Sequence, residues 1–274
     1  MKPDEINFVA DMARAGAGLR IDREKVYLIE SRLTPVARRE GFGSIREMLL
    51  AARQKRDEKL MWAVVEALAA GETWFFRDRP QFDRFRDEIL PALARGRPAG
   101  QAIRVWSAGC GSGQEPYSLA FMVEDAGAAV LACGVDILGS DICERALEKA
   151  QAGLYSQVEV QRGLPIRMLV RHFEKREDLW EISPRVRAMV SWRRVNLHAD
   201  FRALGRFEVI FCRQVLSVMD PDARAGALER LSQALAPGGY LVLGPEETAG
   251  GLGEAFVAVS GGLYRRNPAI SVAA

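Results

Sequence analysis

Up to about residue 95, apolar and charged residues alternate with the period of amphipathic helices. Four segments carry apolar residues at helical spacing, namely residues 5–15, 22–40, 44–53 and 58–70. Asp22 and Ser44 are residue types that favour helix N-caps, and Ser44 precedes Glu47 at the spacing of a capping box. The pattern predicts an N-terminal helical domain over 1–70, followed by a linker over 71–97.

From Pro98 onward, short apolar runs alternate with helical patterns. The runs predict strands, and the patterns between them predict helices, with strands at 103–108, 135–141, 207–212 and 240–244 and helices at 116–125, 144–152 and 222–236. Pro237 and two following glycines form a strong stop signal for the last helix. This alternation predicts a parallel, doubly wound α/β sheet with right-handed crossovers over 98–274.

The alternation is interrupted at about 173–195. Two apolar runs, 180–182 and 188–192, lie on either side of Pro184, and no helical pattern separates them. Short apolar runs joined in this way are typical of antiparallel strands. We therefore expect a small antiparallel β insertion within the α/β domain.

The composition is that of an ordinary folded protein. Of the 274 residues, 49% are hydrophobic and 27% charged, and the net charge of +2 does not indicate a nucleic acid or an anionic membrane as partner. The four cysteines form no CxxC pair and the two histidines stand alone, which argues against a metal site and fits reduced thiols. Neither a signal peptide nor an apolar run of about 18 residues is present. We expect a cytoplasmic monomer without membrane insertion.

The first predicted strand is followed by a glycine-rich loop, at the sheet edge where α/β folds bind ligands. Gly109, Gly111 and Gly113 would let the backbone approach a ligand closely, although such a loop can also simply turn a corner. Glu115 follows at the expected helix start. A carboxylate there would repel a pyrophosphate and attract a cationic ammonium, which favours S-adenosylmethionine (SAM) over NAD.

Three further segments carry candidate chemistry. Asp141, at the tip of the second strand, can accept hydrogen bonds from both hydroxyls of a ribose, or else cap the next helix. Arg213 and Gln214 follow a buried strand, and can contact a cofactor or substrate or form local salt bridges. Thr73 and Arg77 bracket three aromatic residues that periodicity assigns to the core, and this segment could line a groove from the linker side.

These segments resemble the CheR family of chemoreceptor glutamate methyltransferases. The resemblance covers nearly the whole chain, and its motifs occur in order: Thr73-Trp74-Phe75-Phe76-Arg77, Glu115-Pro116-Tyr117-Ser118, Ser140-Asp141-Ile142, Ala150 with Gly153 and Tyr155, Val195-Asn196-Leu197 and Phe211-Cys212-Arg213. It implies a Rossmann-like SAM-dependent methyltransferase domain behind a helical domain, with S-adenosylhomocysteine (SAH) as product. The implied substrate is the cytoplasmic helical bundle of a chemoreceptor.

The resemblance also implies a role for individual residues. It places the methionine part of SAM near Glu115, the ribose near Asp141 and the adenine near Asn196 and Leu197. The full set of implied cofactor contacts is Thr73, Arg77, Glu115, Asp141, Asn196, Leu197, Arg213 and Gln214. Either Arg77 or Arg213 would orient the incoming carboxylate. Basic residues on the second helix, by default a solvated face, become candidates for receptor docking: Arg20, Arg23, Lys25, Arg32, Arg38 and Arg39.

The chain departs from the family pattern at several positions. Gly71 and Gln214 stand where the family has Asn, and Val218 stands where it often has Tyr. These changes leave open a SAM- or SAH-binding adaptor with impaired turnover, while an NAD-dependent oxidoreductase rests only on the glycine loop and Asp141. Only residues 174–178 separate Phe173 from the strand at Leu179, whereas members that bind a C-terminal pentapeptide tether have a longer loop. We therefore expect no tether.

Methyl transfer to a glutamate requires no strong base. A glutamate side chain with a pKa near 4.3 is already a nucleophilic carboxylate at neutral pH. The methyl group on a sulfonium is already activated, so alignment and exclusion of water are sufficient. This chemistry fits a chain that has neither a catalytic histidine motif nor a cysteine nucleophile motif.

Overall fold

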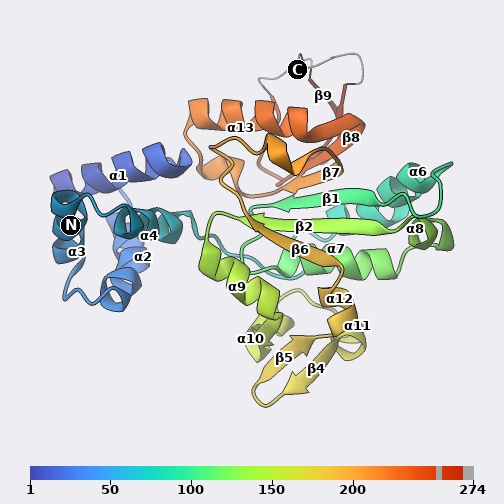
Figure 1. The fold of residues 1–274 in the computed structure, drawn as a ribbon, viewed down its shortest axis with the longest axis horizontal. Helices are drawn as coiled ribbons and strands as arrows, with labels where there is room; N and C mark the ends of the chain where they lie inside the picture. Colours follow the sequence, from blue (N-terminus) through green and yellow to red (C-terminus); the bar gives the residue numbers. More distant parts are fainter. Residues whose placement is uncertain (251–254, 268–274) are drawn as a thin grey trace.

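The N-terminal helices pack around a core of their own at one end of the molecule (Figure 1). The computed structural model describes residues 1–250 and 255–267, so the expected end of the second domain at 268–274 lies outside the described residues. Leu33, Met48 and Val64 are fully buried in this core. The helices are α1 (Pro3–Ala17), α2 (Val26–Arg39), α3 (Ile45–Lys55) and α4 (Glu58–Ala69).

One of the two predicted N-caps is found. Ser44 caps α3 by accepting a hydrogen bond from the backbone N–H of Glu47 at 3.2 Å, while the Glu47 carboxylate accepts from the N–H of Gly43. Asp22 does not cap α2, which begins four residues later. Its carboxylate accepts from the N–H of Glu24 at 3.0 Å and closes a local turn instead.

The second part of the chain is a seven-stranded sheet with the strand order β6-β2-β1-β7-β8-β10-β9. The first five of these strands run parallel, and β10 and β9 add an antiparallel edge. The strands are β1 (Ile103–Ala108), β2 (Val135–Asp141), β6 (Val190–Arg194), β7 (Phe207–Cys212), β8 (Leu235–Leu243), β9 (Phe256–Ser260) and β10 (Leu263–Arg266). The predicted doubly wound α/β fold is confirmed.

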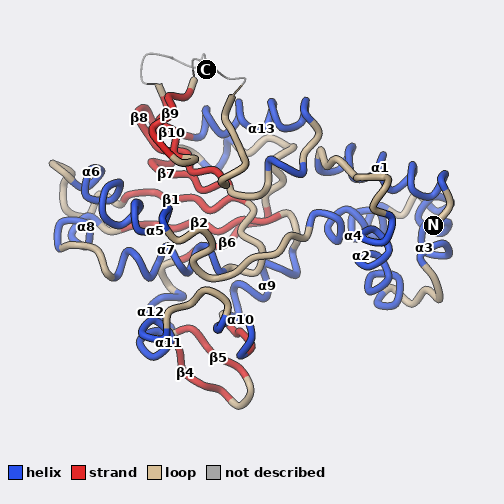
Figure 2. Tube along the Cα trace, turned by 180° about the vertical axis from the view of Figure 1, so that it is seen from behind, coloured by secondary structure: helices blue, strands red, loops and turns tan. Residues whose placement is uncertain are grey.

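Helices cover both faces of this sheet because its central strands are apolar on both sides. Val105 of β1 belongs to the core under α7, whereas its neighbour Trp106 belongs to the core under α13. Figure 2 shows α13 on the opposite side of the sheet from α7 and α9. The helices of this part are α5 (Pro80–Arg84), the π-helix η1 (Phe85–Ile89), α6 (Leu90–Ala94), α7 (Gln114–Glu124), α8 (Ala128–Cys133), α9 (Glu144–Ala152) and α13 (Pro221–Ala234).

A small antiparallel sheet is present, but it differs from the predicted insertion. Its strands are β3 (Leu154–Ser156), β4 (Phe173–Arg176) and β5 (Leu179–Ile182), in the order β3-β5-β4. Three short helices surround it: α10 (Gln157–Gln161), α11 (Ile166–His172) and α12 (Pro184–Arg187).

The prediction that residues 188–192 belong to this insertion is wrong. They contribute instead to β6, which pairs in parallel with β2 at the edge of the main sheet. In this pairing, the ring of Trp192 packs directly over Gly139 of β2. A Cβ at position 139 would lie only 2.5 Å from the ring. The glycine makes room for this indole on the main sheet.

The strand ends and the N-terminal helices meet at one place. The carboxyl ends of β1 and β2 point toward the helical part of the chain (Figure 1). β1 pairs with β2 on one side and with β7 on the other, so the strand order reverses between β1 and β7. Within the two described stretches, no helix is both long and apolar enough to span a bilayer.

Candidate active site

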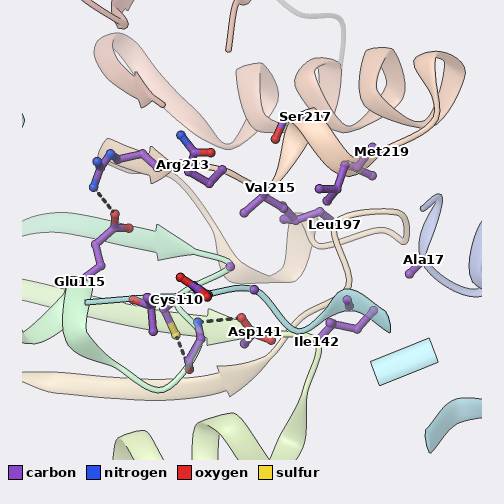
Figure 3. Close-up of a pocket in the computed structure, with 18 of the residues that line it drawn as sticks. Ala17, Cys110, Glu115, Asp141, Ile142, Leu197, Arg213, Val215, Ser217 and Met219 are labelled. Atoms are coloured by element: carbon purple, nitrogen blue, oxygen red, sulfur yellow. Dashed lines mark hydrogen bonds and ion pairs between the residues drawn. The ribbon is translucent and has the colours of Figure 1, made fainter. Parts of the chain in front are cut away.

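A cavity of about 400 Å³ opens at this reversal of strand order. Open α/β sheets bind ligands at such a position, and small-molecule pockets measure roughly 300–1,000 Å³. Figure 3 shows side chains from the strand ends, from the 213–219 loop and from the end of α1 around one space.

All eight residues proposed from the sequence as cofactor contacts line this cavity: Thr73, Arg77, Glu115, Asp141, Asn196, Leu197, Arg213 and Gln214. The departures from the family pattern, Gly71 and Val218, also lie in its wall. The structure thus brings together residues from Gly71 to Val218, which lie 147 positions apart along the chain.

Two glycines of the loop between β1 and α7 lie where a side chain would come too close to a neighbouring residue. Gly109 has a φ of +77°, and a Cβ there would lie 2.3 Å from Cγ2 of Val215. Gly111 has a φ of +55°, and a Cβ would lie 3.1 Å from Cγ2 of Thr73. These positions require glycine both for backbone conformation and for space, and the loop backbone forms part of the cavity wall.

Asp141 joins the glycine loop to the tip of β2. Its Oδ2 accepts a hydrogen bond from the N–H of Gly111 at 2.8 Å, and its Oδ1 accepts from the N–H of Cys143 at 2.9 Å. Burial raises the pKa of Asp141, and the hydrogen bonds from these amides oppose that shift. Asp141 is not the N-cap of α9, because that position is occupied by Cys143.

Glu115 and Arg213 form a buried charged cluster. Arg213 donates from Nη1 to Oε2 of Glu115 at 2.8 Å and from Nη2 to Oδ2 of Asp78 at 2.6 Å. The other oxygen of Glu115 accepts from the hydroxyl of Ser107 at 2.8 Å. The Arg213 side chain is only 2% exposed. Two carboxylates share one guanidinium, so the cluster keeps a net negative charge beside the cavity and suits a cationic ligand.

The linker supplies a second wall. Arg77 donates from Nη1 to the carbonyl of Glu72 at 2.8 Å, and its guanidinium carbon lies 4.3 Å from the ring centroid of Trp74. Phe75 and Phe76 are buried in the sheet core, as their pattern indicated. Trp74 was assigned to the core by the same pattern, but it lines the cavity.

Asn196 connects the two parts of the chain. Its Nδ2 donates to the carbonyl of Gly16 in α1 at 2.7 Å, and its Oδ1 accepts from the N–H of His198 at 3.0 Å. The neighbouring Leu197 is buried, and its carbonyl accepts a hydrogen bond from Arg230. Asn196 and Leu197 thus form a fixed part of the wall.

The wall formed by residues 213–219 is held by a residue that sequence reasoning missed. Glu247 is 6% exposed, and its carboxylate accepts hydrogen bonds from the backbone N–H groups of Gln214, Ser217 and Gly244 at 2.7, 3.0 and 2.9 Å. Gln214 has a φ of +61°, so this turn requires support from its surroundings.

Other lining residues were also not foreseen. Ala17 and Leu19 reach the cavity from the end of α1, and Val215, Ser217 and Met219 complete the 213–219 wall. The sequence carries no signal for the first two, because their position depends on how the helical part docks onto the sheet.

The hydrogen-bonding groups that remain free around the cavity fit SAM. Asp141 accepts one hydrogen bond at each oxygen, and each oxygen keeps a lone pair for a ribose hydroxyl. The buried Nε of Arg213 has no hydrogen-bond partner among the described residues, which is a type of group that a ligand can satisfy. Across the described part of the chain, no group of His, Cys, Asp and Glu is arranged to hold a metal ion.

Comparison with known proteins agrees with this arrangement. The family model "CheR methyltransferase, SAM binding domain" matches residues 71–263. "Chemotaxis protein methyltransferase 1" of Pseudomonas aeruginosa is 34% identical over 255 residues, which are 90% of this chain and 92% of that protein. "Chemotaxis protein methyltransferase Cher2" of Pseudomonas putida is 33% identical over 239 residues, or 86% of each chain.

The similarity to solved structures is much weaker. A TehB-like SAM-dependent methyltransferase from Corynebacterium glutamicum is 18% identical and has a TM-score of 0.34, covering 56% of this chain and 59% of that chain. The sequence relatives and the family match carry the assignment. They confirm the resemblance found in the sequence and identify SAM as the cofactor. The chain belongs to the CheR methyltransferase family.

Proposed function

We propose that this protein transfers a methyl group from SAM to glutamate side chains on the cytoplasmic domains of chemoreceptors, the adaptation step of bacterial chemotaxis. The observation that carries the proposal is the CheR family match over residues 71–263, within which the eight proposed contact residues line one cavity. The relatives are named chemotaxis protein methyltransferases. The protein would act in the cytoplasm, as a monomer.

Individual residues would hold the cofactor in the way that their charges favour. Asp141 would accept hydrogen bonds from the ribose hydroxyls, and Asn196 and Leu197 would border the adenine. The Glu115 carboxylate, fixed by Arg213 and Ser107, would face the cationic amino-acid part. The net negative charge of the Arg213 cluster favours a ligand that carries positive charge on sulfur and nitrogen.

The chemistry requires alignment and no proton transfer. SAM supplies a methyl group on a positively charged sulfur, and as the carboxylate oxygen bonds to this carbon, the C–S electron pair stays on sulfur. The charges of carboxylate and sulfonium cancel in the reaction, so walls that exclude water favour it. Leu19, Leu197 and Met219 supply apolar wall here.

Of the two arginines proposed to orient the substrate carboxylate, Arg77 fits the role better. Arg213 is buried, and its two terminal nitrogens are occupied by Glu115, Asp78 and the carbonyl of Arg77. It would position Glu115 rather than contact the substrate. Arg77 is partly exposed, and of its terminal nitrogens only Nη1 has a hydrogen bond, to a backbone carbonyl, among the described contacts.

We also propose that the receptor is reached without a pentapeptide tether. β4 and β5 are joined by a two-residue turn, Glu177-Asp178, in which Glu177 has a φ of +53°. Such a turn leaves no extended loop to bind a peptide. The basic side chains at 20, 23, 25, 32, 38 and 39 are exposed and are the candidates for receptor docking.

A turnover-impaired adaptor is the second candidate function. Val218 lies in the cavity wall and is 46% exposed, where the family often has a tyrosine. Gly71 and Gln214 replace asparagines in the same wall. An adaptor of this kind would bind SAM or SAH and a chemosensory partner without methyl transfer.

The test is transfer of radiolabelled methyl from SAM to receptor cytoplasmic fragments from the same organism, scored as base-labile methanol. Label on receptor glutamates is the expected result, and it would show that Gly71, Gln214 and Val218 permit turnover. Absence of label from a protein that still binds SAH by calorimetry would favour the adaptor.

A further inference from the structure

A cationic cluster lies beside the cavity, where the small-sheet region meets the linker. Arg162 follows α10, and its Nη2 donates to Oε2 of Glu72 at 2.8 Å. Its guanidinium carbon lies 4.2 Å from the ring centroid of Trp74, and that of Arg77 lies 4.3 Å from the same centroid. Glu72, Trp74 and Arg77 line the cavity, so Arg162 stands at its edge.

The backbone fixes Arg162 in this place. Gly163 has a φ of +87°, and a Cβ there would lie 2.1 Å from the carbonyl oxygen of Phe75 and 3.1 Å from the indole of Trp74. The turn therefore packs directly on the linker backbone. Only glycine is compatible with this contact, and the preceding arginine is held next to Trp74 as a consequence.

The charges of the cluster do not balance. Arg77 and Arg162 carry two positive charges, and Glu72 supplies one carboxylate. The hydrogen bond from Arg162 lowers the pKa of Glu72, so this carboxylate is ionised at neutral pH. The Arg162 side chain is 49% exposed and that of Glu72 is 77% exposed. An ion pair this exposed is weak and can exchange with another carboxylate.

From this juxtaposition we propose that Arg162, held against Trp74, binds an acidic side chain of the substrate protein, one helical turn from the glutamate that is methylated. The inference rests on the proposed function and names a substrate contact for it. On a helix, residues three or four apart lie on the same face at about 5–6 Å, so a second carboxylate can reach the edge of the cavity while the first enters it. Glu72 occupies the guanidinium in the absence of substrate.

The experiment measures two quantities on the full-length protein, the affinity for a receptor cytoplasmic fragment in the presence of SAH and the rate of methyl transfer to that fragment. Arg162→Ala is compared with Arg167→Ala, which removes an exposed arginine of α11 only five residues away. We expect Arg162→Ala to weaken fragment binding and raise the KM for the fragment about fivefold, the loss of one exposed ion pair. The maximal rate and the affinity for SAH should stay unchanged, and Arg167→Ala should match the wild type.

Glu72→Gln supplies a test of opposite sign. It removes the internal competitor for Arg162, so fragment binding should become about two- to threefold tighter, whereas a purely structural ion pair would give weaker binding. Wild-type affinity in Arg162→Ala, or no fragment binding by the wild type, would overturn the inference. A fragment that binds but receives no methyl would contradict the proposed function. In that case, the affinity of Arg162→Ala for the fragment would still show whether Arg162 binds the fragment.

Discussion

At the scale of single residues, Asp141 is the residue expected to bind the ribose of the cofactor. Replacement by Ala removes the proposed acceptor for a ribose and also the acceptor for the N–H of Gly111. We expect Asp141→Ala to weaken SAH binding by about 1–3 kcal/mol, the range for losing a charged hydrogen-bond partner. Isothermal titration calorimetry at neutral pH measures this loss directly.

Asp141→Asn serves as the matched variant, because it keeps one oxygen acceptor at the same position. Its loss of affinity should be smaller than that of the alanine variant. Thermal unfolding should show that both variants remain folded, since Asp141 stands at a strand tip and belongs to none of the apolar cores. Unchanged SAH affinity in Asp141→Ala would refute the assignment to the ribose.

The sequence predicts which polar residues lie at the strand ends, but it does not predict which residues they contact in the fold. Asp141 and Arg213 are predicted because polar residues directly after buried strands lie at one sheet edge, and Glu115 because a carboxylate stands at the start of the helix after the glycine loop. Their contacts with SAM remain predictions. Glu247 and Arg162 carried no such signal, since the first binds backbone amides and the second depends on a turn packed against the linker.

At the scale of secondary structure elements, continuous apolar runs gave accurate strands. The predicted bounds of β1, β2, β7 and α9 agree with the structure. β8 begins at Leu235, five residues before the predicted strand. The residues Pro237–Gly239, which were expected to end the preceding helix, therefore lie within the strand. β6 was placed in the wrong sheet because an edge strand with mixed polarity carries no information about its pairing partner.

The carboxylate of Glu247 joins the 213–219 loop to the end of β8 through three hydrogen bonds. In Glu247→Gln, the amide nitrogen cannot accept a hydrogen bond, so at least one buried N–H among those of Gln214, Ser217 and Gly244 loses its partner. We expect the free energy of unfolding to fall by about 1–3 kcal/mol, measured by urea denaturation.

The exposed neighbour Glu246 provides the control for this variant. Glu246→Gln removes the same charge one residue away, and it should leave the urea midpoint within error of the wild type. Equal midpoints for Glu247→Gln and the wild type would show that the three hydrogen bonds do not stabilise the loop.

The packing of α11 on α7 makes stability depend on pH through His172. Its ring stacks on Phe121 with centroids 4.6 Å apart, and burial, followed by the charge of Arg171, lowers the pKa of His172 to about 4. The unfolded chain therefore binds more protons between pH 6.5 and 4, so the free energy of unfolding falls as the pH drops through this range. Between pH 7 and pH 5, this histidine should account for a loss of about 2 kcal/mol.

Urea denaturation at both pH values checks this prediction. His172→Phe keeps an aromatic ring against Phe121 and cannot titrate, so its stability should change less between pH 7 and pH 5 than that of the wild type. The same loss in both proteins would mean that another group is responsible.

At the scale of the whole molecule, the helical region completes the cavity by docking onto the 213–220 segment. Leu19 forms an antiparallel bridge with Met219, and the N–H of Arg20 donates to the carbonyl of Val218 at 2.9 Å. The N–H of Asp220 donates to the carbonyl of Gly18 at 2.8 Å. These contacts join residues about 200 positions apart. No local pattern encodes them, which is why the sequence predicted both parts of the chain but not this wall.

Gly18 is the position where the docking can be tested without touching the cofactor pocket directly. It ends α1 with a φ of +65°, and a Cβ there would lie 2.5 Å from Cβ of Ala223 in α13 and 2.9 Å from Nδ1 of His198. Gly18→Ala must therefore push α1 away from the sheet domain. We expect weaker SAH binding and a loss of stability of about 1–3 kcal/mol beyond the cost of the backbone conformation.

Gly41→Ala isolates that backbone cost. Gly41 has a φ of +82°, but no atom lies within 4 Å of the position of a Cβ, so the variant introduces the same type of strain without a clash. Calorimetry should show that Gly41→Ala binds SAH like the wild type, whereas Gly18→Ala binds it several-fold more weakly. If both variants bound SAH equally well, the N-terminal helices would not contribute to the cofactor site, and Leu19 would be an incidental part of its wall.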